Sequence, residues 1–152
     1  MNISEAINEV KLTQTDIQRL FQDADLKMTN QRIAVYREVM RNREKHFHPT
    51  AEQIYEGVHE QLPAISLNTV YRTLTSLVEK GLVKRLSSFA SSDLYDGLLS
   101  DHWHFVCTRC GSVQDVFVEN KSFPDISGKI TGNVEEIVVQ IRGICRECQG
   151  KD

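Results

Sequence analysis

The sequence predicts an α+β fold in two parts: an N-terminal winged helix-turn-helix domain (residues 1–96) and, after a hinge at 97–101, a small α/β domain (102–152). Two observations lead to this prediction. Amphipathic helical patterns follow one another closely in the first part and give way to a short strand pair, which is the element order of a winged helix. All four cysteines lie in the second part, as two CxxC pairs.

Four helices are expected in the first part, because apolar residues recur there at the spacing of one helix face. The expected helices cover residues 15–24, 29–42, 50–63 and 66–81. The hydroxyl of Thr29 can cap the second helix, and the segment from Thr50 to Gln53 has the pattern of a capping box at the third. Pro63 ends the third helix, and Gly81 is a favourable C-cap for the fourth.

The expected strands are fewer and shorter. A strand pair at residues 82–87 and 94–96, joined by a turn, follows the helices. The second part shows alternating patterns that predict strands at 103–107, 113–118 and 136–144, with a short helix near 124–130. A domain of roughly 50 residues has a limited core, so we expect a bound metal ion and a second subunit to stabilise it.

The four cysteines predict a structural zinc site. Two CxxC pairs supply four thiolates to one tetrahedral ion, and Zn²⁺ is its usual occupant; the ligands are Cys107, Cys110, Cys145 and Cys148. Disulfides and redox-active thiols are the alternatives. The N-terminal residues show no apolar signal segment and nothing in the chain predicts a membrane span, so we expect a cytoplasmic location, where reduced thiols favour the metal.

The fourth helix carries the candidate nucleic-acid contacts. Its face outside the predicted core shows Asn68, Thr69, Tyr71, Arg72, Thr75 and Ser76. We expect Tyr71 and Arg72 to reach base edges of double-stranded DNA, with Lys80, Lys84 and Arg85 near phosphates. The net charge of −3 does not exclude this partner, because residues 1–88 carry 12 Lys and Arg against 11 Asp and Glu, whereas residues 89–152 carry 6 against 10. An ordinary solvated helix face is the alternative.

A second metal site is predicted from the histidines. His102 and His104 alternate on one predicted strand, so both imidazoles can point at one ion, and Asp96 and Asp115 flank them in the sequence. Imidazole and carboxylate ligands together suit Fe²⁺, Mn²⁺ or Zn²⁺. Histidines that bind no metal are one alternative. An iron oxygenase is another, but the sequence shows no cosubstrate motif, and we expect no enzymatic activity.

Several segments together resemble the ferric uptake regulator family. They are residues 28–32 (MTNQR), 48–55 (HPTAEQIY), 65–74 (ISLNTVYRTL), 81–83 (GLV) and 102–111 (HWHFVCTRCG). The resemblance implies a metal-dependent homodimeric repressor that binds an operator of dyad symmetry. It also implies a C-terminal dimerisation domain, a sensing metal at the hinge and a zinc ion held by four cysteines.

Within this family, the ligand pattern is most similar to that of the peroxide-responsive repressors. The resemblance implies a regulatory Fe²⁺ or Mn²⁺ held by His48, Asp96, His102, His104 and Asp115. It further implies that peroxide reacts at the iron and oxidises a ligand imidazole, His48 or His102, to 2-oxo-histidine. Asp115 favours peroxide sensing, since iron sensors more often have Glu there. A regulator of iron, zinc or manganese supply without this chemistry is the alternative.

Overall fold

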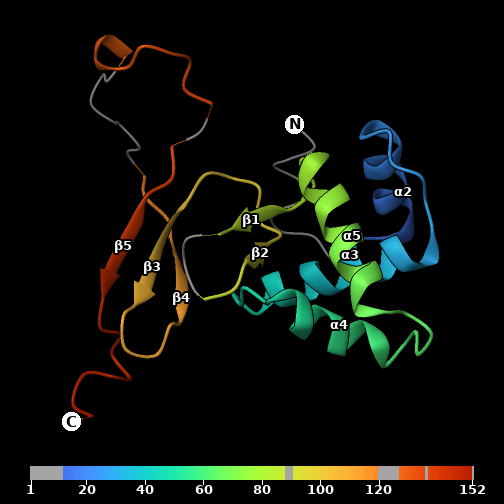
Figure 1. The fold of residues 1–152 in the computed structure, drawn as a ribbon, viewed down its shortest axis with the longest axis horizontal. Coiled ribbons are helices and arrows are strands. Elements are labelled where there is room, and N and C mark those ends of the chain that lie inside the picture. Colours follow the sequence, from blue (N-terminus) through green and yellow to red (C-terminus); the bar gives the residue numbers. More distant parts are fainter. Residues whose placement is uncertain (1–11, 88–90, 120–126, 136, 152) are drawn as a thin grey trace. The chain divides into compact units, whose positions relative to one another are not determined.

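The computed structural model describes residues 12–87, 91–119, 127–135 and 137–151, which fall into two compact units divided after Ser100. The first unit contains α2 (Gln14–Asp23), α3 (Asn30–Glu44), α4 (Ala51–His59), α5 (Leu67–Glu79), β1 (Lys84–Leu86) and β2 (Leu94–Asp96) (Figure 1). The second contains β3 (Trp103–Cys107), β4 (Val113–Val116), the 3-10 turn η1 (Ser127–Lys129) and β5 (Gln140–Gly143).

Side-chain caps fix the beginnings of the helices. Thr29 caps α3 and Ser66 caps α5, each hydroxyl accepting a hydrogen bond from a backbone N–H in the first turn. Thr50 and Gln53 form the predicted capping box of α4, and α2 has a further one, from Thr13, that the sequence reading did not identify. Each cap satisfies backbone donors that lack an intrahelical partner.

The core of the first unit lies among its helices. Phe21 of α2 and Tyr36 of α3 are fully buried and meet edge to face, with ring centroids 5.6 Å apart. Val70, Leu74 and Leu77 of α5 face the same core. Because one stripe of α5 is buried in this way, its other residues are left on the surface of the unit, as the helical periodicity predicted.

The β1–β2 hairpin forms the wing of the first unit. The strands are antiparallel, with Lys84 opposite Asp96 and Leu86 opposite Leu94. The backbone N–H of Tyr95 also donates a 2.9 Å hydrogen bond to the carbonyl of Pro49, which precedes α4. This bond ties β2 to the segment before α4.

The second unit is a three-stranded sheet in the order β4-β3-β5 (Figure 1). β3 pairs antiparallel with β4 and parallel with β5. Large apolar side chains are exposed on and around its last strand: Val134, Ile137, Val138, Ile141 and Ile144. An apolar surface of this kind on so small a unit is typical of an interface with another chain.

The structure corrects several predicted boundaries. The third helix ends at His59 and not at Pro63, and the chain continues as a turn in which Leu62 N–H still donates to the Val58 carbonyl. The helix near 124–130 is only a 3-10 turn in its described part, residues 127–129, since 124–126 lie outside the described residues. The last strand is shorter than 136–144. None of the described helices is long and apolar enough to cross a membrane.

Candidate metal centres and DNA-binding face

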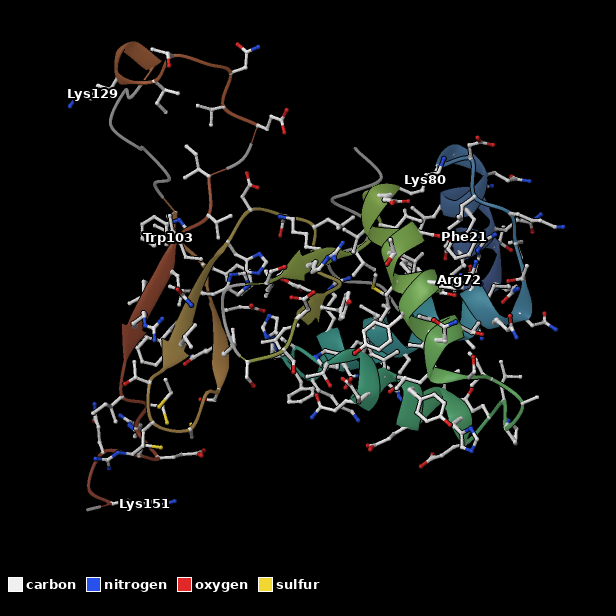
Figure 2. All side chains as sticks on the ribbon, in the orientation of Figure 1. Phe21, Arg72, Lys80, Trp103, Lys129 and Lys151 are labelled. Carbon is white, nitrogen blue, oxygen red and sulfur yellow. The ribbon has the colours of Figure 1, made fainter. Side chains whose placement is uncertain are left out.

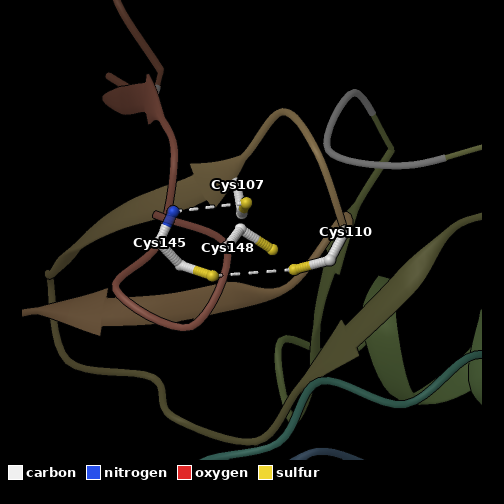
Figure 3. Close-up of side chains that lie close together, drawn as sticks. All are labelled: Cys107, Cys110, Cys145 and Cys148. Carbon is white, nitrogen blue, oxygen red and sulfur yellow. Dashed lines mark hydrogen bonds between the residues drawn. The ribbon is translucent and has the colours of Figure 1, made fainter. Parts of the chain in front are cut away.

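The four cysteines converge at one end of the sheet (Figure 3). Cys107 ends β3 and Cys110 follows it, while Cys145 and Cys148 follow β5, the parallel neighbour of β3. The four sulfur atoms lie within 4.8 Å of one another, and Cys110 Sγ is 3.8 Å from Cys145 Sγ. A disulfide needs about 2.05 Å. Tetrahedral Zn²⁺ with Zn–S bonds of about 2.3 Å places its sulfurs about 3.8 Å apart, so the donor set fits zinc.

Backbone hydrogen bonds stabilise the thiolate form of one cysteine in this cluster. The N–H of Cys145 donates to Cys107 Sγ at 3.3 Å, and this bond, with others from the first CxxC turn, lowers the pKa of the Cys107 thiol to about 6. A hydrogen bond with Ser112, whose Oγ lies 3.2 Å from the sulfur, lowers the pKa of Cys110. Hydrogen bonding to Cys145 raises the pKa of Cys148 to about 12. Four sulfurs without a cation therefore do not all ionise together, which is the expected behaviour of a metal-binding set.

Arg109, inside the first CxxC turn, also holds the second one. Its Nη1 donates a 2.8 Å hydrogen bond to the carbonyl of Cys148 and contacts the carbonyl of Lys151. The guanidinium thus links the two cysteine turns independently of the sulfur atoms. Sequence reasoning missed this role, because an arginine within a CxxC turn carries no signal of a partner 39 residues away.

Three predicted ligands come together in the second unit. His102 directly precedes β3 and His104 lies within it; their Nε2 atoms are 3.0 Å apart, and Asp115 lies opposite His104 on β4. Asp115 Oδ1 is 3.2 Å from His102 Nε2 and 3.5 Å from His104 Nε2. These side chains are only 1%, 6% and 8% exposed. Phe117, itself largely exposed, lies beside the His102 ring, with centroids 5.8 Å apart and the two planes tilted by 31°.

The other two predicted ligands meet in the first unit. His48 Nε2 lies 3.8 Å from Asp96 Oδ2, and both side chains are 3% exposed. The Pro49–Tyr95 backbone bond brings their segments together. The N–H of Leu98 donates to Asp96 Oδ1 at 2.7 Å, which fixes the carboxylate. A buried imidazole beside a buried carboxylate is the arrangement of a metal ligand with its oriented partner, or of two ligands to one ion.

The candidate DNA-binding residues lie where the helical period placed them. Asn68, Tyr71 and Arg72 are exposed on α5, on which Figure 2 labels Arg72, and Thr69 is half-buried beside the cap. The hydroxyl of Thr69 lies 2.9 Å from that of Ser66. The hydroxyl of Tyr71 donates a 2.6 Å hydrogen bond to Glu52 of α4, a residue that sequence reasoning did not single out.

The cations expected near phosphates are dispersed over the first unit. Lys84 is half-buried on the wing strand β1. Its neighbour Arg85 lies 3.8 Å from Asp93 across the hairpin, and Lys80 lies 3.9 Å from Asp25, which follows α2. Arg85 and Lys80 thus each have a carboxylate nearby, whereas the exposed Arg72 forms no ion pair within the described part of the chain.

The fold and its donor sets define the class of the protein. A winged helix presents a helix to duplex DNA, and a fused unit that binds metal lets such binding respond to that metal, as in metal-responsive transcriptional regulators. The sequence matches the ferric uptake regulator family over residues 23–141, and the chain belongs to that family, which comprises metal-responsive transcriptional repressors.

Individual relatives are similar along most of the chain. The peroxide-responsive repressor of Staphylococcus aureus is 32% identical over 130 residues, which cover 84% of this chain and 86% of that protein. Among solved structures, the peroxide stress regulator of Campylobacter jejuni is 28% identical with a TM-score of 0.61, covering 91% of this chain and 100% of that one. The ferric uptake regulator of Vibrio cholerae is 25% identical with a TM-score of 0.63, covering 86% and 100%.

Proposed function

We propose that this protein is a metal-dependent homodimeric repressor that releases its operator when peroxide oxidises a histidine ligand. One observation carries the proposal: the buried cluster of His102, His104 and Asp115. Their donor atoms are separated by 3.0 to 3.5 Å. Neighbouring ligands of an octahedral ion with bonds of about 2.1 Å lie about 3.0 Å apart. The cluster therefore has the spacing of ligands around one ion, although it supplies too few of them to complete a coordination shell.

The remaining ligands of the proposed site are His48 and Asp96. They belong to the first unit and are already buried beside each other. If the ligands of the first unit and those of the second unit bind one ion, the link at residues 97–101 is held in one conformation. The two α5 helices of a dimer then have one fixed spacing. That spacing must match successive major grooves of an operator with dyad symmetry. Metal would act here by favouring the DNA-competent arrangement over others.

Peroxide sensing depends on which ion is bound. Fe²⁺ held by these residues would supply the one-electron chemistry that cleaves the O–O bond of hydrogen peroxide. The net change would be transfer of one oxygen atom from peroxide to C2 of an imidazole, with release of water. His48 and His102 are the imidazoles we expect to be oxidised. An oxidised ring is a poorer ligand, so the site loses one of its five protein donors. Mn²⁺ would support DNA binding without this reaction.

The resemblance to the S. aureus repressor and the aspartate at position 115 support this function over sensing of metal supply. The test uses protein loaded with Fe²⁺ or with Mn²⁺, and measures DNA binding and intact mass before and after micromolar peroxide. We expect only the iron form to lose binding, with the mass of one oxygen atom mapped to His48 or His102. Binding that survives in both forms would contradict peroxide sensing.

Regulation by metal supply is the second candidate. The similarity to the V. cholerae ferric uptake regulator favours it, since that protein has nearly the same TM-score as the peroxide stress regulator. The same experiment separates the two, because a supply regulator binds DNA in proportion to free metal and stays unmodified by peroxide.

A further inference from the structure

The hydrogen bond between Tyr71 and Glu52 joins the two helices of the helix-turn-helix on the outside of the first unit. Tyr71 lies on α5 and is 41% exposed, and Glu52 lies in the first turn of α4. The donor and acceptor oxygens are 2.6 Å apart, within the range of hydrogen bonds to ionised acceptors. The contact spans 19 positions in the sequence, so it is a tertiary contact and not a consequence of either helix alone.

The direction of this hydrogen bond is set by charge. The bond from Tyr71 is the main cause that lowers the pKa of Glu52, and the Glu52 carboxylate in turn raises the pKa of Tyr71. At neutral pH the carboxylate is therefore ionised and accepts, while the phenol keeps its proton and donates. The hydroxyl of Tyr71 is thereby committed to Glu52, and the aromatic ring is held in one direction.

Glu52 also places a negative charge next to the proposed DNA-binding face. Phosphates dominate non-specific affinity, so a carboxylate here opposes binding to any duplex equally. A ring held in place can in contrast contact thymine methyl groups at defined positions in the major groove, which depends on sequence. A residue that weakens the non-specific contacts and positions a base-contacting ring raises the ratio between specific and non-specific binding.

We propose that Glu52 is a specificity-determining residue that acts by positioning Tyr71 on the DNA-binding face. This inference rests on the proposed function, since it requires that α5 enter the major groove of an operator. The ligand is duplex DNA, read through the Tyr71 ring, with Glu52 itself bound to the hydroxyl and not to a base.

The test compares dissociation constants for two duplexes in the Mn²⁺-loaded protein at one salt concentration. One duplex is selected from a random pool by the wild-type protein, and the other is a scrambled sequence of the same length and composition. We expect Glu52→Ala to lower the ratio of the two constants about tenfold, the usual effect of losing a hydrogen bond to a charged group. Glu52→Gln keeps an acceptor and should retain most of the ratio.

A double-mutant cycle tests whether Glu52 changes the ratio of dissociation constants through Tyr71. If Glu52 acts through Tyr71, then Tyr71→Phe lowers the ratio too, and Glu52→Ala has no further effect in the Tyr71→Phe background. The matched control is Glu56→Ala, which removes an exposed carboxylate one turn further along α4 and should change both constants equally. Thermal unfolding checks that each variant is folded. If Glu52→Ala does not fold, the test uses Tyr71→Phe, which removes only one oxygen atom.

Two results would overturn the inference: an unchanged ratio in Glu52→Ala, or losses that multiply in the double variant. Failure of the proposed function looks different. If the wild-type protein selects no duplex from the random pool in the presence of metal, α5 is not a DNA-reading helix. If it does select one and the Glu52 variants keep the ratio, only the role of Glu52 is wrong.

Discussion

At the scale of single residues, Asp115 connects both imidazoles of the His-x-His motif through one oxygen. It does so because β4 runs antiparallel to β3 with Asp115 directly opposite His104. In this position its Oδ1 atom lies 3.2 Å from His102 Nε2 and 3.5 Å from His104 Nε2. A carboxylate in this position would offer a single oxygen to an ion held by both histidines, which would keep a further coordination position free for peroxide.

Replacing Asp115 by Glu should therefore separate DNA binding from peroxide release. The longer side chain can offer both oxygens, which would close the position that peroxide needs while keeping a carboxylate ligand. We expect metal-dependent DNA binding to persist and oxidation of the iron form to slow about tenfold or more, which corresponds to only about 1.4 kcal/mol in the barrier. Rates of oxygen incorporation by mass spectrometry measure this. The control is Asp101→Glu, the same substitution at an exposed position. An unchanged oxidation rate in Asp115→Glu would show that the aspartate at position 115 does not determine the peroxide response.

Candidate site residues can be predicted from the sequence where residue type and short spacing are enough to indicate their chemistry. His102, His104 and the four cysteines were identifiable because residue type and short spacing already restrict their function. The structure brings His102, His104 and Asp115 together, although the sequence could not specify that Asp115 would contact both histidines. Glu52 could not be found in this way, since its partner is on another helix and an exposed glutamate near a capping box is ordinary.

At the scale of secondary-structure elements, α3 and α4 approach closely at Gly57. A Cβ atom added there would lie 2.5 Å from Cδ of Glu38, which is buried against α4. The Glu38 carboxylate cannot easily move aside, because Arg41 binds it at 2.6 Å and Asn42 Nδ2 donates to it at 3.1 Å. The glycine therefore permits an ion pair to lie between the two helices.

Gly57→Ala should destabilise the first unit despite the better helix propensity of alanine. Displacing Glu38 corresponds to overpacking, which costs about 1–3 kcal/mol, against a gain of about 1 kcal/mol from propensity. We expect a net loss of about 1 kcal/mol in the free energy of unfolding, measured by chemical denaturation. In a Glu38→Ala background the same change should become stabilising. A stabilising effect in the wild-type background would show that Glu38 relaxes freely.

The beginnings of α3, α4 and α5 were predictable because their caps are local, whereas the ends of β5 were not. Thr29, Thr50 and Ser66 each cap a helix within three residues of sequence. β5 in contrast is limited to Gln140–Gly143 because it pairs with β3 over His104–Cys107 only, and that partner lies 36 residues away at each pair. The parallel direction of this pairing is likewise a property of the sheet and not of either strand.

The four cysteines lie at the adjoining ends of β3 and β5, so removal of the zinc ion that we expect them to hold should unfold the second unit selectively. Structural zinc contributes about 10–16 kcal/mol in small domains that depend on it. We expect a strong chelator to abolish the cooperative unfolding of the second unit while the helical circular dichroism of the first persists. Cys110→Ser should act in the same direction. Loss of helical signal in parallel with zinc release would instead show that the first unit depends on the metal.

At the scale of the whole molecule, the proposed regulatory ligands are divided between the two units. His48 and Asp96 belong to the first and the other three to the second. A metal ion bound by residues of both units favours the arrangement of the units in which all metal–ligand bonds form. A shift of that arrangement from 1% to 99% of the population needs about 5.5 kcal/mol. Metal–ligand bonds are strong enough to supply this. An ion held by the ligands of one unit alone would not favour any one arrangement of the two units.

His48→Ala and His102→Ala should therefore have the same phenotype, although the residues lie in different units. We expect each to reduce the metal-dependent gain in operator affinity from about 100-fold to under about 3-fold, with four-cysteine zinc still present by elemental analysis. Combining them should add nothing, because one ion is lost in every case. His46→Ala, an exposed histidine two residues before His48, is the control and should behave as wild type. Metal-dependent binding retained in His48→Ala would mean that the first unit does not contribute to the regulatory site, and the coupling would then have to arise within the second unit alone.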